Sequence, residues 1–211
     1  MKKLILPAIE TNTVRILRAK LTDAAAAQRL WKRTDGVYKI FKEDVTSALK
    51  AIQSNRCAYC GARLYEKRPH RDHIAPKSPH YKWTFWPANL VLACYCCNVD
   101  CKNEVDTVTV VALTYKRTTF NIVHPFLDEP SEHLNFAIDK NAILIRSKNG
   151  SEKGKRTIEL FRLMEPERAK QRAKDVLFDE DVAHLQGITR GKYLEAIQEL
   201  NSVPIRMKFT S

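Results

Sequence analysis

The chain has 211 residues and a formal net charge of +12, from 36 Lys and Arg against 24 Asp and Glu. Hydrophobic residues make up 44% and charged residues 28% of it, which excludes a wholly disordered chain. No apolar run approaches the roughly 18 residues that a membrane span needs, so a transmembrane protein is excluded. The excess of positive charge favours a polyanionic partner.

The first residues, MKKLILPAIE, begin like a secretory signal. Their apolar stretch is only about five residues long and lacks a small-residue cleavage site. We therefore interpret this segment as mature protein and expect a cytoplasmic location.

Residues 1–56 are expected to form a helical arm after a short extended start. The segment 21–33, LTDAAAAQRLWKR, predicts one helix with Thr22 as its N-cap. A second helix is expected over Asp44–Ser54, where apolar residues recur at helical spacing.

Beyond residue 56, the patterns of β-branched residues, prolines and turn residues predict short alternating elements. These are strands over Leu90–Ala93 and Val108–Leu113, a hairpin over Phe136–Ile145, and helices from Cys97, over Thr157–Leu163, from Pro166 and over Tyr193–Leu200. No glycine- or serine-rich linker separates them. We expect an α+β protein with a helical arm (1–56), a cysteine-rich core (57–105) and a mainly helical C-terminal region (106–211) that packs on the core or on a partner.

The cysteines are confined to one stretch of the chain. Cys57 and Cys60 form one Cys-x-x-Cys pair, and Cys94 and Cys97 form a second. Because no export signal is present, two such pairs indicate a tetrahedral zinc site rather than a disulfide framework. Four thiolates close the coordination shell, so this zinc would be structural and would join two distant segments.

Two further cysteines, Cys96 and Cys101, lie outside these pairs. We interpret them as small buried hydrophobic residues. Cys96 in place of Cys97 as the fourth ligand is the alternative, although the x-x spacing favours Cys97.

Polar residues beside the cysteine pairs supply the groups that phosphodiester hydrolysis needs. Histidine suits a general base because its unperturbed pKa lies near neutrality. Carboxylate and amide oxygens suit Mg²⁺ or Mn²⁺. We therefore predict that His73 activates water and that Asp72 and Asn98 hold a divalent ion. Neighbouring strand residues point to opposite faces, so Asp72 and His73 share a site only if the strand ends or bulges there.

Basic residues surround the predicted site. Residues 56–82 carry seven Lys and Arg against two acidic residues, which favours a surface that faces phosphates. The candidate phosphate contacts are Arg68, Arg71, Lys77 and, further along the chain, Lys102. His70 and His80 flank the site; we interpret them as solvated loop histidines, and contact with phosphate or metal is the alternative.

The motifs CAYC, RDHIAPKS and NLVLACYCCN resemble, in this order, the HNH endonuclease superfamily, whose shared unit is a ββα-metal finger. The match runs from Cys57 to about Asn103. Asn89 and Asn98 keep the family's nine-residue interval, and the resemblance implies that the Asn89 amide orders the long loop of the catalytic unit. Asparagine replaces the last histidine of many members. The family's lysine three residues later is absent, since Cys101 stands there and Lys102 follows.

A narrower resemblance adds WTFWPANL, VHPFLDEPSEHLNF and GKRTIELFRLMEPERAKQRAKDV. Together these motifs look like the HNH nuclease subunit of Septu-type and retron-associated anti-phage systems. That resemblance implies a role in antiviral defence and an SMC/ABC-like ATPase subunit as partner.

We therefore expect a metal-dependent endonuclease with structural Zn²⁺ and catalytic Mg²⁺ or Mn²⁺, acting on DNA ahead of RNA. The alternative is a catalytically inactive zinc-knuckle subunit that binds nucleic acid or serves as a scaffold. The intact Asp72-His73 pair favours the enzyme, because binding alone needs no base beside an acid. A membrane-surface binder is disfavoured, since no basic amphipathic helix has a clear apolar face.

Overall fold

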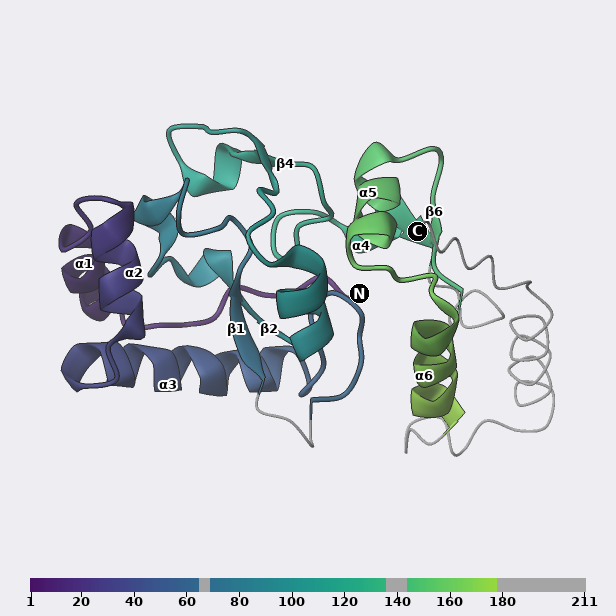
Figure 1. Cartoon of the computed structure of the whole chain (residues 1–211), viewed down its shortest axis with the longest axis horizontal. Coiled ribbons are helices and arrows are strands. Elements are labelled where there is room, and N and C mark those ends of the chain that lie inside the picture. Colours follow the sequence, from purple (N-terminus) through teal and green to yellow (C-terminus); the bar gives the residue numbers. More distant parts are fainter. Residues whose placement is uncertain (65–68, 136–143, 178–211) are drawn as a thin grey trace, which may run out of the picture.

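The computed structural model describes residues 1–64, 69–135 and 144–177. It has the mixed α+β composition that was expected (Figure 1). The α-helices are α1 (Thr11–Ala19), α2 (Ala24–Lys32), α3 (Gly36–Ile52), α4 (Pro130–His133), α5 (Glu152–Leu160) and α6 (Pro166–Leu177). The strands are β1 (His70–His73), β2 (Leu90–Ala93), β3 (Val108–Val110), β4 (Thr119–Phe120), β5 (Leu134–Asn135) and β6 (Arg146–Ser147), which pair in chain order as two-stranded antiparallel sheets. Short helical turns are η1 (Tyr81–Trp83), η2 (Pro87–Asn89), η3 (Cys96–Lys102) and η4 (Tyr115–Arg117).

The N-terminal arm is helical, as predicted, but its boundaries differ. The cap of α2 is Asp23 rather than Thr22, because the Asp23 carboxylate accepts the N–H of Ala26 (2.7 Å). The helix expected from Asp44 begins earlier, at Gly36. The additional turns bury Tyr38 and Phe41 against the core, and this tertiary burial extends the helix beyond the segment that periodicity alone identified.

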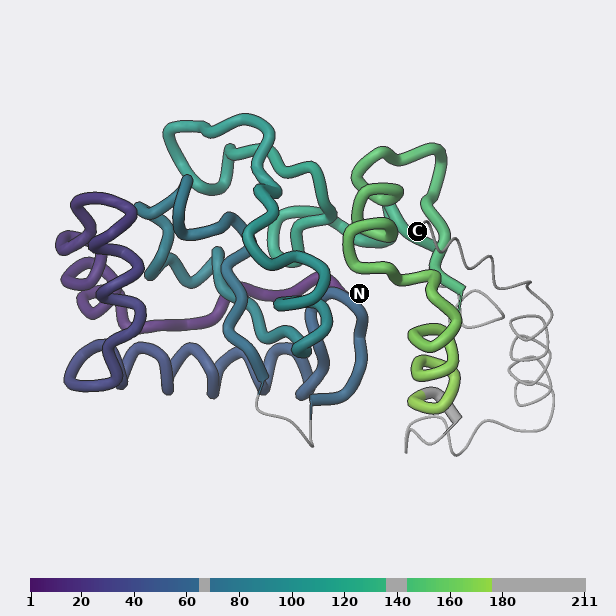
Figure 2. The backbone as a smooth tube through the Cα atoms, in the orientation of Figure 1, coloured from purple at the N-terminus to yellow at the C-terminus, as the bar shows by residue number. Residues whose placement is uncertain are grey.

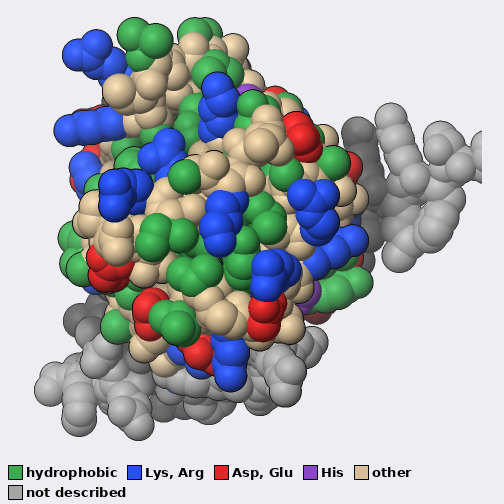
Figure 3. Space-filling model, turned by 90° about the vertical axis from the view of Figure 1, so that its left-hand side faces the viewer, with side chains coloured by type: hydrophobic (Ala, Val, Ile, Leu, Met, Phe, Trp, Pro, Cys, Tyr) green, Lys and Arg blue, Asp and Glu red, His purple; other side chains and the backbone are tan. Residues whose placement is uncertain are grey.

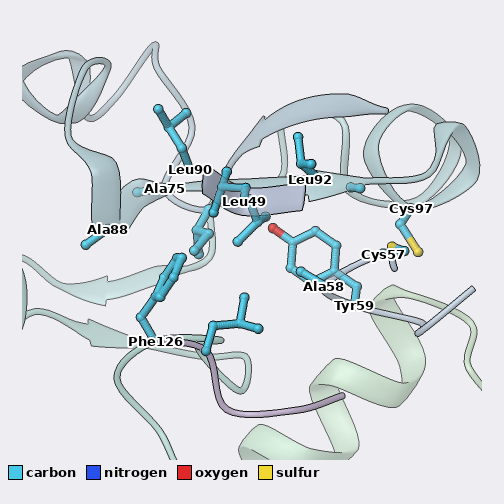
Figure 4. Packing of buried hydrophobic residues seen from close by; sticks show 14 of the residues in the cluster. Leu49, Cys57, Ala58, Tyr59, Ala75, Ala88, Leu90, Leu92, Cys97 and Phe126 are labelled. Atoms are coloured by element: carbon cyan, nitrogen blue, oxygen red, sulfur yellow. The ribbon is translucent and has the colours of Figure 1, made fainter. Parts of the chain in front are cut away.

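Helix α3 covers the sheet formed by β1 and β2, and it runs along one side of the molecule in Figure 1. Leu49 of α3 packs with Leu90, Leu92 and Tyr59 in the buried cluster of Figure 4. Just beyond the helix, the Gln53 side chain donates to the Leu92 carbonyl (2.8 Å) and accepts the Leu92 N–H (2.9 Å). The open edge of β2 is therefore held against the end of α3 by a paired amide contact.

The central segment runs strand, long loop, strand, helix. Strands β1 and β2 pair with Asp72 opposite Val91 and His73 opposite Leu90. The predicted strand over Leu90–Ala93 is confirmed as β2. The helix expected from Cys97 is η3, a π-helix rather than an α-helix, whose end is closed by a bond from the Asn103 N–H to the Asn98 carbonyl (2.8 Å).

The C-terminal helices α4 to α6 lie at the opposite end of the molecule from α1 and α2 (Figure 2). Pro166 begins α6, as predicted, whereas α5 begins and ends a few residues before the predicted Thr157–Leu163. Strand β3 stops at Val110 rather than Leu113, after an irregular pairing with β4. The predicted hairpin over Phe136–Ile145 falls mostly, and the helix over Tyr193–Leu200 wholly, outside the described residues.

Basic side chains are spread, among apolar and acidic ones, across the face at the end of the molecule where α1 and α2 lie (Figure 3). None of the helices in the described ranges is both long enough and apolar enough to cross a membrane.

Candidate active site

The two Cys-x-x-Cys pairs meet in one cluster, as the sequence predicted. The sulfurs of Cys57, Cys60, Cys94 and Cys97 all lie within 4.8 Å of one another, and Cys60 and Cys94 are 3.8 Å apart. Tetrahedral zinc with Zn–S bonds of about 2.3 Å requires sulfurs about 3.8 Å apart. Burial raises the pKa of the Cys57 thiol well above its usual value, so a bound cation would be needed to keep it ionised. This donor set fits zinc; Cys57 and Cys97 are seen together in Figure 4.

The remaining cysteines lie beside this cluster and contact α6. The Arg168 guanidinium donates to Cys97 (3.2 Å), and its other nitrogen lies 2.6 Å from Cys96 and 3.2 Å from Cys101. Arg172 follows one helical turn after Arg168, and both line a small pocket of about 160 Å³ beside the cysteine cluster. Four thiolates and Zn²⁺ would carry two net negative charges, which these guanidinium groups offset. Cys96 and Cys101 are therefore half-buried acceptors for an arginine rather than buried hydrophobic residues.

A second, larger cavity of about 790 Å³ opens beside β1. It brings together the three residues that we predicted for catalysis, Asp72, His73 and Asn98. Asp72 faces η3, whereas His73 faces α2. Strand β1 ends at His73, which is the condition under which these neighbours were expected to share a site.

Asp72 is held by two donors. Its Oδ2 accepts the Tyr59 hydroxyl (2.5 Å), and its Oδ1 accepts the Lys102 ammonium (3.3 Å), which also donates to the His73 carbonyl (2.6 Å). Burial raises the pKa of Tyr59 well above its usual value, as does the Asp72 charge, so this hydroxyl remains a donor. Its ring stacks on Phe161 at a centroid distance of 4.0 Å. Phe161, directly after α5, therefore helps to hold the Tyr59 hydroxyl in place against the Asp72 carboxylate.

His73 is held as a neutral imidazole. Its Nε2 lies 2.9 Å from the Thr84 carbonyl, which can only accept, so Nε2 carries the proton and Nδ1 carries the lone pair. Burial lowers the pKa of His73 well below its usual value, with a further contribution from the Lys77 charge. The Trp31 ring meets the imidazole edge-on at 4.3 Å. Buried Lys42 donates to the Trp31 carbonyl and so fixes the end of α2 against this ring.

Asn89 is fully buried and forms the centre of a hydrogen-bond chain. Its side chain accepts the Ala75 N–H (2.7 Å) and donates to the carbonyls of Ala75 (3.0 Å) and Trp83 (3.2 Å). Tyr115 donates to the Asn89 oxygen (2.9 Å) and in turn meets His124 Nε2 (2.9 Å). Both ends of the loop between β1 and β2 are thus tied to one amide.

Asn98, on η3, meets the ring of His70. The Asn98 amide nitrogen is 3.1 Å from His70 Nδ1, and both residues line the large cavity. His70 is therefore a residue of the site rather than a solvated loop histidine. His80 lies elsewhere, with its Nε2 2.9 Å from an Asp106 oxygen.

The predicted phosphate contacts fall in three different settings. Arg71 and Lys77 line the cavity, where burial lowers the pKa of both groups, and Arg71 donates to Thr46 of α3 (2.9 Å). Lys102 also lines the cavity, but it is only 1% exposed and its ammonium pairs with Asp72 rather than pointing to the rim. Arg68 lies outside the described residues.

Sequence reasoning did not identify three polar residues that support the site: Tyr59, Tyr115 and His124. The position of Tyr59 within the Cys-x-x-Cys turn was the only available signal, because the turn fixes its place next to the metal cluster. Tyr115 and His124 are brought in by long-range folding, and nothing in their local sequence indicates this.

The fold and the site together define an α+β protein with a four-cysteine cluster fit for zinc and a separate polar cavity. The chain is 28% identical over 180 residues to "Septu protein PtuB" of Bacillus mycoides (strain KBAB4), an alignment that covers 74% of this chain. This similarity supports a PtuB-like relationship. The chain spans 59% of the length of that relative. A comparison with protein-family models gives no match.

Proposed function

We propose that this chain is a divalent-metal-dependent endonuclease that hydrolyses nucleic-acid phosphodiester bonds, with an HNH-type ββα-metal unit formed by β1, β2 and η3. The observation that carries the proposal is the convergence of Asp72, His73 and Asn98 on one cavity. The cavity is also lined by the basic residues Lys50, Arg71 and Lys77 against the acidic Glu104, a balance that favours a polyanion.

His73 supplies the base. The Thr84 carbonyl fixes the Nε2–H tautomer, so Nδ1 accepts a proton from a water while the water oxygen attacks phosphorus. The bond from phosphorus to the leaving ester oxygen breaks, and that oxygen takes a proton from a solvent water and departs as a hydroxyl group. A neutral imidazole is the competent form, and burial keeps His73 neutral at physiological pH.

Asp72 and Asn98 would hold the divalent ion. When bound, such an ion stabilises negative charge on the phosphate and on the leaving oxygen. Tyr59 and Lys102 orient the Asp72 carboxylate through the bonds described above. A metal held by the cysteine cluster would fix Tyr59, because Cys57 and Cys60 flank it in the chain. The structural site therefore supports the catalytic one.

Plasmid DNA and a matched RNA provide the test. We expect cleavage with Mg²⁺ or Mn²⁺ that stops with EDTA and returns when the ion is added back. His73→Ala should lower the rate by about 10²–10⁴-fold. His80→Ala is the matched control, because this histidine pairs with Asp106 instead. Equal cleavage by wild type and His73→Ala would exclude His73 as the base.

One observation favours a second function, a non-catalytic nucleic-acid-binding or scaffold subunit. The Lys102 ammonium occupies one oxygen of Asp72, as an ion pair that serves only structure would. Binding of DNA without cleavage under any divalent ion would support this function instead.

We further propose a role in anti-phage defence beside an SMC/ABC-like ATPase subunit. The similarity to Septu protein PtuB supports this role. Co-purification with an SMC/ABC-like ATPase of the same cells, and loss of phage resistance in cells that carry His73→Ala, would test it.

A further inference from the structure

The side chain of the proposed metal ligand Asn98 contacts a histidine that no part of the mechanism uses. His70 lies two residues before Asp72 on β1, so both side chains project from the same face of the strand towards η3. His70 Nδ1 is 3.1 Å from the Asn98 amide nitrogen, and both residues line the cavity with Asp72. Tyr95 packs edge-on against the imidazole at 5.6 Å and restrains its orientation.

The spacing of these two groups matches adjacent ligands of one cation. Octahedral coordination with bonds of about 2.1 Å places neighbouring donor atoms about 3.0 Å apart. A half-turn of the Asn98 amide exchanges its nitrogen and oxygen, so the oxygen then occupies the position that faces His70 Nδ1. The imidazole nitrogen and the amide oxygen would then form one edge of a coordination shell.

The charges of the cavity explain why a nitrogen ligand is useful here. Asp72 is the one anionic donor of the proposed ligand set, and Lys102 lies 3.3 Å from its Oδ1. A hard ion such as Mg²⁺ depends on anionic oxygens and is therefore weakly held beside an ammonium group. A neutral imidazole adds affinity without adding charge, and it does so mainly for Mn²⁺ and later transition metals.

We infer that His70 is a third protein ligand of the divalent ion and makes the site select Mn²⁺-like ions over Mg²⁺. This inference rests on the proposed function, because it assigns one more ligand to the same ion. Thr84 binds the Nε2–H of His73 on the other side of the strand, so the two histidines serve separate roles.

Mn²⁺ bound to the zinc-loaded full chain is the probe. Thiolates retain zinc against Mn²⁺, so Mn²⁺ reports the second site. Electron spin-echo spectroscopy should show nitrogen modulation from a coordinated imidazole in wild type, in His73→Ala and in His80→Ala, and none in His70→Ala. His70→Ala should also weaken Mn²⁺ binding by about tenfold or more while Mg²⁺ binding changes less. If His70→Ala destabilises β1, His70→Gln is the variant to use in its place.

Asp72→Ala separates the two proposals. Nitrogen modulation that persists in both His70 variants, while Mn²⁺ binding still depends on Asp72, would overturn the role of His70 and leave the proposed nuclease site intact. Mn²⁺ binding that is absent or independent of Asp72 would overturn both.

Discussion

His124 is expected to make the fold sensitive to mild acid. It is fully buried, its Nδ1 accepts the N–H groups of Phe126 (3.1 Å) and Leu127 (3.2 Å), and its Nε2 meets Tyr115. Burial lowers the pKa of His124 from 6.5 to about 3. Below pH 6.5 the unfolded chain therefore takes up a proton that the folded chain does not, and the free energy of unfolding falls as the pH falls.

The magnitude follows from this difference in pKa. Each unit of pH between the two values costs about 1.4 kcal/mol, so lowering the pH from 6.5 to 5.0 should remove about 2 kcal/mol through His124 alone. Other groups titrate in the same range, so the comparison needs a matched variant. His124→Asn keeps an acceptor for the N–H groups of Phe126 and Leu127 but has no ionisable ring.

The free energy of unfolding in urea is measured at pH 6.5, 6.0, 5.5 and 5.0 for wild type and for His124→Asn, and the comparison between the two cancels any pH-dependent loss of metal that they share. The variant should be less stable at pH 6.5, and its free energy of unfolding should fall with a shallower slope than that of wild type. Parallel pH dependences for the two chains would refute the role of His124 as a buried neutral histidine.

Three further predictions concern the groups that support the site. Asn89→Ala should lower the free energy of unfolding by about 3 kcal/mol or more in urea, because it leaves buried partners at Ala75, Trp83 and Tyr115 unpaired; a change below 1 kcal/mol would contradict the loop-ordering role. Tyr59→Phe removes a hydrogen bond to a carboxylate and should cost about 2 kcal/mol at pH 7, whereas a thermally neutral variant would show that this contact contributes little. Mass spectrometry of the native chain should find bound zinc, and chelation should lower the thermal midpoint sharply; a metal-free chain of unchanged stability would rule out the structural site.

The parts of the site that local sequence encodes were predicted well. The Cys-x-x-Cys spacing is a short-range property, and the four sulfurs do converge. The apolar segment of β2 and the proline that begins α6 were also correct, because burial of a short apolar run and the fixed φ of proline act within a few residues.

The parts that depend on tertiary contacts were not predicted. Lys102 was expected at a phosphate, but the π-helical geometry of η3 and the nearby Asp72 carboxylate turn its ammonium inward. Cys96 and Cys101 contact Arg168 of α6, which lies 72 and 67 residues further along the chain, so their local sequence could not reveal this partner. The N-cap of α2 is a smaller example: Thr22 and Asp23 are adjacent and both can cap a helix, but it is the Asp23 side chain that accepts the Ala26 N–H.

Chemical rescue tests the central proposal, that His73 is the base of a phosphodiester hydrolase, most directly. Single-turnover cleavage of a labelled oligonucleotide is measured for wild type, His73→Ala and Asp72→Ala at saturating Mn²⁺, with and without added imidazole. We expect imidazole to restore part of the lost rate to His73→Ala and none to Asp72→Ala, because only the first lacks a proton acceptor. A His73→Ala chain that cleaves at the wild-type rate without imidazole would contradict the proposal.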